Sequence, residues 1–259
     1  MELLTNGMGL SVVVFFPLIS AFIITLIPKA QEQLIKRFAL VSSLITFVLS
    51  AVLLFQFDFS SADKLQLGNK ISWIKSINAN YEIGIDGISL PLLVLSTFIT
   101  VLAIIYSIEH LPEPKSPKGF LALILVLETG MNGTFVALDL ILFFVFFEIV
   151  LLPMYFMIGI WGDKTVRTVS GFKNQIETRL YASIKFFVFT LFGSAFMLLG
   201  FLGLYYRGNK TFSIPELIEL GTSGAFTGTF ATLVFAVLFL GFAVKVPMWP
   251  LHTWLPDAH

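Results

Sequence analysis

Long apolar runs alternate with short polar segments along this chain of 259 residues. Seven runs approach or exceed the roughly 20 residues that an α-helix needs to cross the hydrocarbon layer of a bilayer. They are residues 9–27, 38–57, 87–107, 119–138, 140–161, 180–206 and 226–251. The runs are continuous and do not alternate, which argues against a transmembrane β-barrel. The pattern predicts an all-α polytopic membrane protein with about seven transmembrane helices.

The basic residues between the runs predict an orientation, because cytoplasmic loops carry an excess of Lys and Arg. The first, third and fifth loops hold nine such residues, among them Lys36, Arg167 and Lys173, whereas the second and sixth loops hold five. We therefore expect the odd-numbered loops in the cytoplasm and the N-terminus outside. The first run is expected to be a retained span and not a secretory signal, because Glu2 and no basic residue precedes it and its apolar stretch is too long.

Two segments between the runs are expected to fold. The loop 58–86 holds short β-prone pieces and predicts a small hairpin on the outer face. The pieces are residues 65–67, 71–74 and 81–85, with turns expected at 68–70 and 78–80. Ser213 and Glu216 fit a capping box that opens a short helix from Pro215 to Leu220. The Ile and Leu residues of this helix favour a position at the membrane interface.

The composition agrees with a membrane protein. Apolar residues make up 57% of the chain and charged residues 12%, against roughly 45–50% and about 25% in soluble domains. The formal net charge is zero, which leaves no electrostatic basis for general nucleic-acid binding. The sequence has no Cys and only three His without ligand spacing, so no metal site is expected. It also lacks a motif for a redox cofactor.

Ionisable residues inside the apolar runs are the candidates for chemistry, because a charge at the bilayer centre costs at least about 2.5–3.5 kcal/mol and is usually functional. Glu148 follows Asp139 by roughly 14 Å of helix, which places it near the midplane. Asp139 itself is expected to be a helix cap or turn residue. The alternative for Glu148 is a carboxylate that only fixes helix packing.

Lys245 lies in the seventh run, two residues before Pro247 and five before Pro250. Neither proline has the N–H that would bond the carbonyl four residues earlier, so the carbonyls of Ala243 and Val246 are expected to be free and the helix broken. A broken helix that bears a charge is a frequent ion site in transporters. The alternative is a lysine that extends to the cytoplasmic edge from a helix end.

Glu128 is a further intramembrane candidate. It lies ten residues after Lys118, and Thr129 and Asn132 are expected to be its polar neighbours. The alternative is a protonated, hydrogen-bonded carboxyl without a role in transfer.

Lys185 and His252 complete the set. Lys185 lies only five residues into its run, so snorkelling competes with function, although Ser183 offers a polar neighbour. His252 follows the break in the seventh run, and an imidazole, which titrates near neutrality, can pass a proton. The alternative for His252 is an ordinary interfacial histidine. Two carboxylates and two lysines on different helices are the components of a proton relay, since unit charges about 4 Å apart interact by several kcal/mol at an effective dielectric near 20.

Several segments resemble the antiporter-like proton-pumping membrane subunits of respiratory complex I. They are residues 147–162 around Glu148, the Ile184-Lys185-Phe-Phe stretch, residues 245–259 from Lys245 to His259, and residues 81–90 at the entry to the third run. The pattern is most similar to the subunit-4 (chain M) type of NADH-quinone oxidoreductase. The related multisubunit Na⁺/H⁺ antiporters and membrane-bound hydrogenases share much of it.

The resemblance implies roles for the candidates. In that family the glutamate of the fifth span and the lysine of the seventh form the pumping pair, which match Glu148 and Lys245. Lys185 matches a connecting lysine and His252 the histidine after the broken span, whereas Glu128 lies at no signature position. The implied partners are other membrane subunits of complex I, including paralogous antiporter-like subunits, and the lipid bilayer. NADH and quinone would be bound only by partner subunits, with no cofactor in this chain, and the implied location is the bacterial inner membrane.

Family members are roughly twice as long, with about fourteen spans in two inverted repeats. The chain is therefore expected to be an N-terminal fragment with an incomplete antiporter-like fold. Residues 1–118 would form a three-span region with the hairpin loop, and residues 119–259 an incomplete first repeat.

Three functions stay open at this point. The first is proton translocation as a subunit of NADH-quinone oxidoreductase, coupled to electron transfer from NADH to quinone in partner subunits. The second is membership of a multisubunit Na⁺/H⁺ antiporter or a membrane-bound hydrogenase. The third is a non-pumping membrane scaffold, in which the intramembrane charges only fix helix packing.

Overall fold

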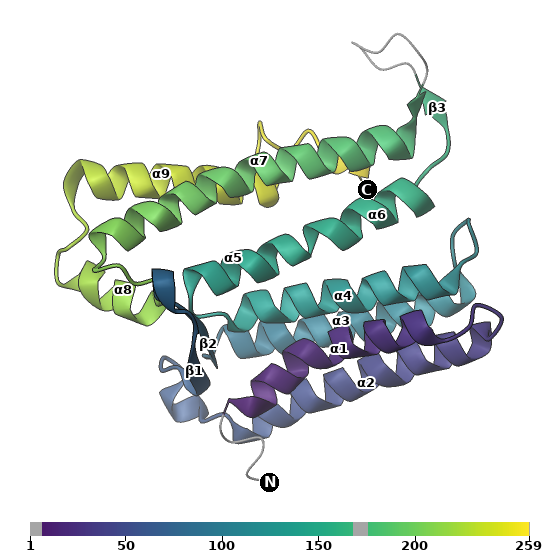
Figure 1. The fold of residues 1–259 in the computed structure, drawn as a ribbon, viewed down its shortest axis with the longest axis horizontal. Helices are drawn as coiled ribbons and strands as arrows, with labels where there is room; N and C mark the ends of the chain where they lie inside the picture. Colours follow the sequence, from purple (N-terminus) through teal and green to yellow (C-terminus); the bar gives the residue numbers. More distant parts are fainter. Residues whose placement is uncertain (1–6, 168–175, 259) are drawn as a thin grey trace. The chain divides into compact units, whose positions relative to one another are not determined.

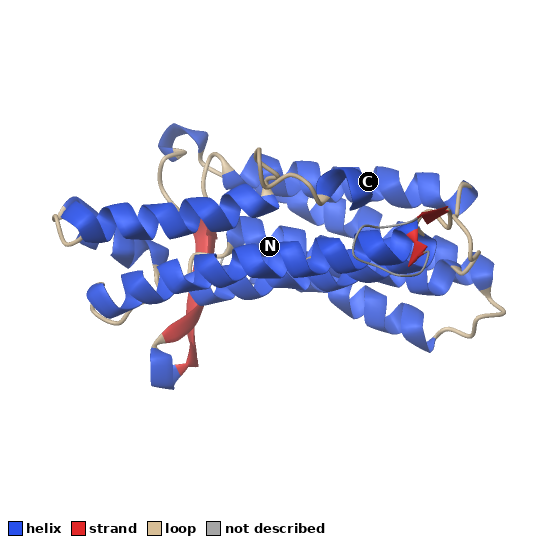
Figure 2. Cartoon of the chain, turned by 90° about the horizontal axis from the view of Figure 1, so that it is seen from above, coloured by secondary structure: helices blue, strands red, loops and turns tan. Residues whose placement is uncertain are grey.

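A computed structural model describes residues 7–167 and 176–258. Glu2, Lys173 and His259 therefore lie outside the described residues. Within those ranges, seven helical segments are long and apolar enough to cross a membrane, which confirms the prediction from the apolar runs. Helices make up most of the chain, and the described strands form only two short hairpins (Figure 2). The chain divides into two compact units, Met1–Val150 and Leu151–His259. The boundary expected at residue 118 stays a prediction.

The first unit is a bundle of helices. Its helices are α1 (Met8–Leu26), α2 (Glu32–Gln56), α3 (Ser89–Glu109), α4 (Pro117–Val136) and α5 (Leu140–Ile149). Figure 1 shows α1 to α4 lying side by side, with α5 against α4. Buried apolar side chains from α1, α3 and α5, among them Leu10, Leu93 and Phe146, form its core.

The proline inside α1 leaves one carbonyl without its helical donor, and a neighbouring helix supplies another. Pro17 lies inside α1 and has no N–H to donate to the carbonyl of Val13, four residues earlier. The side-chain amide of Asn132 in α4 donates to that carbonyl instead, at 3.4 Å, while its oxygen accepts from the Ser96 hydroxyl of α3 at 3.3 Å. One amide thus joins three helices at the position where α1 lacks a bond.

The predicted hairpin is present, with a different internal arrangement. Strand β1 (Gln66–Ile74) pairs antiparallel with β2 (Ala79–Ile85), and the short helices η2 (Phe59–Ser61) and η3 (Lys75–Ile77) flank β1. The turn expected at 68–70 is wrong, because these residues belong to β1 and only its register is irregular there. Gly68 lies so close to β2 that an added Cβ would be 3.1 Å from the carbonyl oxygen of Ile83. The glycine therefore serves close strand approach and not a turn.

Asp139 anchors the hairpin to the helices. It is the N-cap of α5, as expected, and one carboxylate oxygen accepts from the N–H groups of Ile141 and Leu142 at 2.9 and 3.2 Å. Its other oxygen accepts from the N–H of Asn80 in β2 at 2.9 Å. Burial raises the pKa of this carboxyl, although the three N–H donors and the charge of Lys70 oppose that shift.

The second unit consists of the remaining helices. They are α6 (Leu151–Trp161), α7 (Thr178–Arg207), α8 (Ile214–Thr222), α9 (Gly228–Lys245) and α10 (Leu255–Ala258), with the two-residue strands β3 (Val166–Arg167) and β4 (Ile176–Glu177) before α7. Helices α7 and α9 approach closely through glycines. A Cβ at Gly193 would lie 2.7 Å from Val244, and one at Gly200 would lie 2.6 Å from Leu238. Small residues at such contacts are a frequent basis of helix packing in membranes.

Two predicted spans are shorter or less regular than expected. The fifth run contains two helices, because α5 ends at Ile149 and α6 begins at Leu151. Pro153 has no N–H for the Ile149 carbonyl, which accounts for the interruption. The seventh run is helical only to Lys245 and not to residue 251, so the predicted break is confirmed and begins immediately after the lysine.

The capping box is also wrong in its contacts, although the short helix α8 is present. Ser213 is the N-cap of α8 but its side chain makes no capping bond. The Glu216 carboxylate instead accepts from the Thr211 hydroxyl at 2.6 Å, and that hydroxyl oxygen accepts from the Ser213 N–H at 3.1 Å. The two bonds of Thr211, which lies two residues before the N-cap, thus replace the reciprocal bonds that Ser213 and Glu216 would make in a capping box.

The Asp139 anchor predicts a graded effect of substitution. Asp139→Ala removes a helix cap and leaves the buried N–H of Asn80 without an acceptor, and we expect a loss of stability on the order of 2–4 kcal/mol. Asp139→Asn keeps one acceptor oxygen for the α5 cap but presents an amide to Asn80, so its loss should be smaller. Hydrogen exchange should show faster exchange at Asn80 in both variants and a frayed start of α5 only in the alanine variant. Equal exchange at Asn80 in all three proteins would contradict the anchor.

Candidate proton-transfer groups

Lys245 is the last residue of α9, and close helix packing holds the turn that precedes it. Val244 lies against Gly193 of α7, and Gly241 is so near the Gly193 carbonyl that an added Cβ would be 2.9 Å from its oxygen. The next residue, Val246, still donates its N–H to Phe242 at 2.8 Å. The lysine therefore projects from the final helical turn before the chain becomes irregular.

The backbone after Lys245 corrects one expectation. Ala243 does not have a free carbonyl, because the N–H of Met248 donates to it at 2.9 Å, one residue beyond the usual helical donor. This bond spans five residues, whereas a regular α-helical bond spans four. It therefore bypasses Pro247, which has no N–H. Within the described ranges no donor reaches the Val246 carbonyl, so only that half of the expectation is met.

Trp254 closes the next carbonyl of the broken helix. Its indole Nε1 donates to the Val244 carbonyl at 2.9 Å. The ring is buried, with its centroid 5.3 Å from that of Phe186 in α7, and it belongs to an apolar cluster with Leu151 and Ile158 of α6. The segment after the break is thus folded back onto α7 and α6. Sequence reasoning missed this role of Trp254.

Lys185 in α7 bonds to the same folded-back segment. Its Nζ lies 2.7 Å from an Asp257 carboxylate oxygen and 2.6 Å from the Thr253 carbonyl oxygen. Its stem lines a small hollow of about 260 Å³ beside Tyr181. Ser183, the expected neighbour, donates instead to the Leu180 carbonyl. Asp257 was missed, although it is the only acidic residue after Lys245.

The residues of the predicted relay are divided between the two units. Glu148 is the penultimate residue of α5 in the first unit and is half-buried. Lys185, Lys245 and His252 are in the second unit. His252 lies in the irregular segment between α9 and α10, and its Nδ1 is buried without a hydrogen-bond partner among the residues that the structure describes. Glu148 and Lys245 share one property, since each lies within two residues of a helix interruption.

Glu128 differs from the other candidates. Its side chain is fully buried in the middle of α4, and neither carboxylate oxygen has a hydrogen-bond partner within the described part of the chain. The polar neighbours expected for it bond elsewhere, because Thr129 donates to Leu125 and Asn132 to Val13. The expectation of a hydrogen-bonded carboxyl is therefore wrong for these partners.

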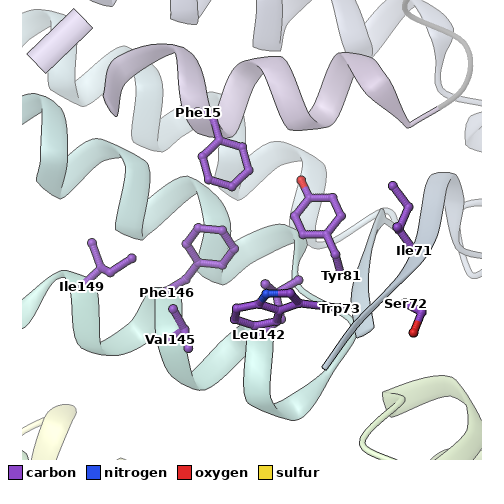
Figure 3. A pocket seen from close by; sticks show the side chains of 9 residues that line it. All are labelled: Phe15, Ile71, Ser72, Trp73, Tyr81, Leu142, Val145, Phe146 and Ile149. Carbon is purple, nitrogen blue, oxygen red and sulfur yellow. The ribbon is translucent and has the colours of Figure 1, made fainter. Parts of the chain in front are cut away.

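The first unit also contains an apolar hollow of about 460 Å³ between α1, the hairpin and α5. Figure 3 shows Phe15 of α1, Tyr81 and Trp73 of the hairpin and Phe146 of α5 around it. The Tyr81 hydroxyl is 2.8 Å from the Ser11 hydroxyl, and burial raises the pKa of this tyrosine. The lining offers no carboxylate, lysine or histidine, so this hollow is separate from the candidate proton-transfer groups.

Two family models together match nearly the whole chain. The model described as NADH-ubiquinone oxidoreductase chain 4, amino terminus, matches residues 12–134. The model described as the transmembrane region of NADH:quinone oxidoreductase/Mrp antiporter matches residues 137–259.

Curated relatives agree with these models. The chain is 38% identical over 252 residues to NAD(P)H-quinone oxidoreductase chain 4 of Gloeobacter violaceus, an alignment that covers 96% of this chain and 43% of the relative. It is 37% identical over 259 residues to NADH-quinone oxidoreductase subunit M of Rickettsia bellii, with 96% of this chain and 48% of the relative covered. The chain thus spans a little under half the length of these relatives.

Solved structures share the fold. A chain of respiratory complex I from Thermus thermophilus with bound NADH matches with a TM-score of 0.77 and 26% identity, over 96% of this chain and 46% of that one. A chain of the Mrp complex from Dietzia sp. matches with a TM-score of 0.77 and 17% identity, over 96% and 25%, which shows the fold alone. With its seven apolar helices the chain is an integral membrane protein, and it belongs to the family of antiporter-like membrane subunits of NADH:quinone oxidoreductase and the Mrp antiporters.

Proposed function

We propose that the chain is part of a proton-translocating subunit of NADH-quinone oxidoreductase, in which Glu148 and Lys245 are the central pair. The observation that carries the proposal is the position of Lys245 as the last residue of α9, where the helix breaks inside the seventh apolar run, residues 226–251. Irregular backbone in that environment is tolerated where it lines protein or a hydrated cavity, and transporters use such breaks to bind ions.

The backbone around the break limits how a proton would reach Lys245. Met248 and Trp254 bond the carbonyls of Ala243 and Val244, whereas no donor among the described residues reaches the Val246 carbonyl, so this carbonyl would be an acceptor that orients water beside the lysine. Lys245 would receive and release a proton there and so alternate between charged and neutral forms. A lysine can do this, whereas an arginine stays protonated.

The other candidate residues also have roles in the proposed proton transfer. Glu148, beside the interruption between α5 and α6, would exchange its proton in response to the charge on Lys245. Lys185 and His252 would connect the pair to the folded-back segment that carries Asp257. The resemblance to the family supports these roles, whereas Glu128 has no counterpart among its signature residues.

The electron-transfer chemistry would belong to other subunits. The sequence has no cysteine and no cofactor motif, so NADH and quinone would act through partner subunits, among them paralogous antiporter-like chains. The bias of Lys and Arg supports a bacterial inner-membrane orientation with the N-terminus outside.

A cation/proton antiporter is the second candidate. It is favoured by the family model, whose description names both groups, and by the fold of the Mrp complex. Membranes that hold the full-length protein would distinguish them. NADH-driven proton uptake that is lost with the subunit supports the first function, and sodium-dependent proton exchange without NADH oxidation supports the second.

The switching lysine predicts that Lys245→Arg abolishes proton pumping, although it conserves the charge. The arginine cannot become neutral, so the transfer step would stop. The measurement is NADH-driven proton uptake in membrane vesicles, normalised to the assembled amount of the full-length variant. Glu148→Gln, which keeps volume and deletes the titratable group, should show the same loss. Normal pumping by assembled Lys245→Arg would support the scaffold function instead.

The ion pair of Lys185 and Asp257 predicts coupled effects. Lys185→Ala and Asp257→Asn should each reduce pumping partially, well short of the loss in Lys245→Arg, because they loosen the folded-back segment without removing the switching group. If the pair acts as a unit, the double variant should pump about as well as either single variant. Independent, additive losses would show that the contact is incidental.

The orientation predicts which side of the membrane each loop faces. The chain has no native Cys, so single cysteines at Lys36 and Lys70 can be labelled without background. A membrane-impermeant thiol reagent should label position 36 only from the cytoplasmic side and position 70 only from the outer side. The reverse pattern would invert the proposed topology.

A further inference from the structure

Glu128 is an intramembrane acid that the pair of Glu148 and Lys245 does not use. It is 0% exposed in α4, and neither carboxylate oxygen meets a hydrogen-bond donor in the described ranges. No ion pair to it is seen there either. An isolated buried carboxylate is very costly, whereas its protonated form is far less so. The burial therefore favours a neutral carboxylic acid.

The glycines of α4 show which way Glu128 points. Gly130 lies against Val150, which directly follows α5, and Gly133 lies against Phe146 of α5. They follow Glu128 by two and five residues, which is roughly 200° and 140° around the helix. Glu128 is thus on the face opposite α5, the helix that carries Glu148.

The face that Glu128 shares with Asn132 meets other helices. Asn132, one turn further along α4, bonds to Val13 of α1 and Ser96 of α3. Helices α3 and α4 are consecutive spans and run in opposite directions, so one turn back to Glu128 on α4 corresponds to one turn forward to Thr100 on α3. Glu128 therefore lies at the level of Thr100.

No counter-charge is available at that depth in the described helices packed on this face. The ionisable residues of α1, α2 and α3 lie only near helix ends; they are Glu32, Lys36, Arg37, Tyr106 and Glu109, with none in α1. On α5, Glu148 lies on the other side of α4 from the Glu128 face. The environment thus stabilises a proton on Glu128 and not a charge.

Buried hydroxyls lie along α2 and α3 on both sides of this depth. On α2 they are Ser42, Ser43, Thr46 and Ser50, and on α3 Thr97, Thr100 and Ser107. The Ser50 and Thr97 hydroxyls are 2.7 Å apart, which brings the two rows together. Most of these groups donate to a carbonyl of their own helix, for example Thr46 to Ser42 and Thr100 to Ser96. Their oxygens retain acceptor capacity, and a hydroxyl can rotate to pass a proton.

We propose that Glu128 is a second proton-holding site, a neutral carboxylic acid that exchanges its proton through the hydroxyl rows of α2 and α3 and not through Glu148. Rows of small polar residues alone would be ordinary helix packing. The second observation is the fully buried carboxyl of Glu128 on the adjacent helix α4, because this acid would supply the proton that the hydroxyls of α2 and α3 conduct. The existence of the site does not depend on the proposed pumping function.

Infrared spectroscopy of the full-length protein in its assembled complex tests the proposal. The carbonyl stretch of a protonated carboxylic acid should be present at neutral pH and should be lost in Glu128→Gln. Glu148→Gln is the control and should leave this band unchanged. Because glutamine is also neutral, Glu128→Gln should keep its assembled amount. If that variant fails to assemble, Glu128→Asp should shift the same band. A spectrum that neither substitution alters would overturn the proposal.

The exchange route has its own test. In D₂O the Glu128 band should shift as the proton exchanges, and Thr100→Val should slow this shift several-fold. Thr134→Val is the matched control, because its hydroxyl bonds Gly130 on the far face of α4 and should leave the rate unchanged. A band that never shifts, or equal rates in both valine variants, would overturn the route. A Glu148→Gln variant that still pumps would refute the proposed function and leave these outcomes untouched.

Discussion

The need to satisfy every backbone carbonyl in lipid constrains this structure most strongly, because water is not available there as a substitute partner. At two irregularities in the spans a replacement donor is present. Beside Pro17 of α1 the Asn132 amide donates to the Val13 carbonyl. After α9 the Met248 N–H bonds Ala243, and the Trp254 indole closes the following carbonyl. The segment after α9 is thus held by specific hydrogen bonds and is not a frayed helix end.

Close helix contacts set the direction in which the charged residues project. Gly133 admits the Phe146 ring between α4 and α5, and Gly193 admits Val244 between α7 and α9. A side chain at either glycine would push the helices apart or rotate them. Because Lys245 follows Val244 directly, the contact at Gly193 also determines the face of α9 from which the lysine leaves. Small residues remote from the chemistry hence position the groups that would perform it.

The spans and the break after Lys245 could be predicted from the sequence, since apolar run length and proline position are local properties. The donors that repair the break could not, because Met248 shifts by one residue and Trp254 reaches back through tertiary packing. The same applies to Asp257, which meets Lys185 across 72 positions of sequence. Hydrophobicity gives the depth of Glu128, but only the contacts of α4 give the direction in which it points.

Depth alone does not distinguish the two intramembrane glutamates, whereas the backbone around them does. Glu148 lies beside the interruption between α5 and α6, and Lys245 lies at the end of α9. Both are therefore next to peptide groups outside the regular helical hydrogen-bond pattern. Glu128 lies within continuous helix, and α4 presents no irregular backbone there. Transfer over a distance needs polar groups that can reorient, while storage needs only a sealed site. In the proposed function, the interruptions would therefore mark the groups that exchange protons rapidly, and Glu128 would exchange only as fast as neighbouring hydroxyls rotate.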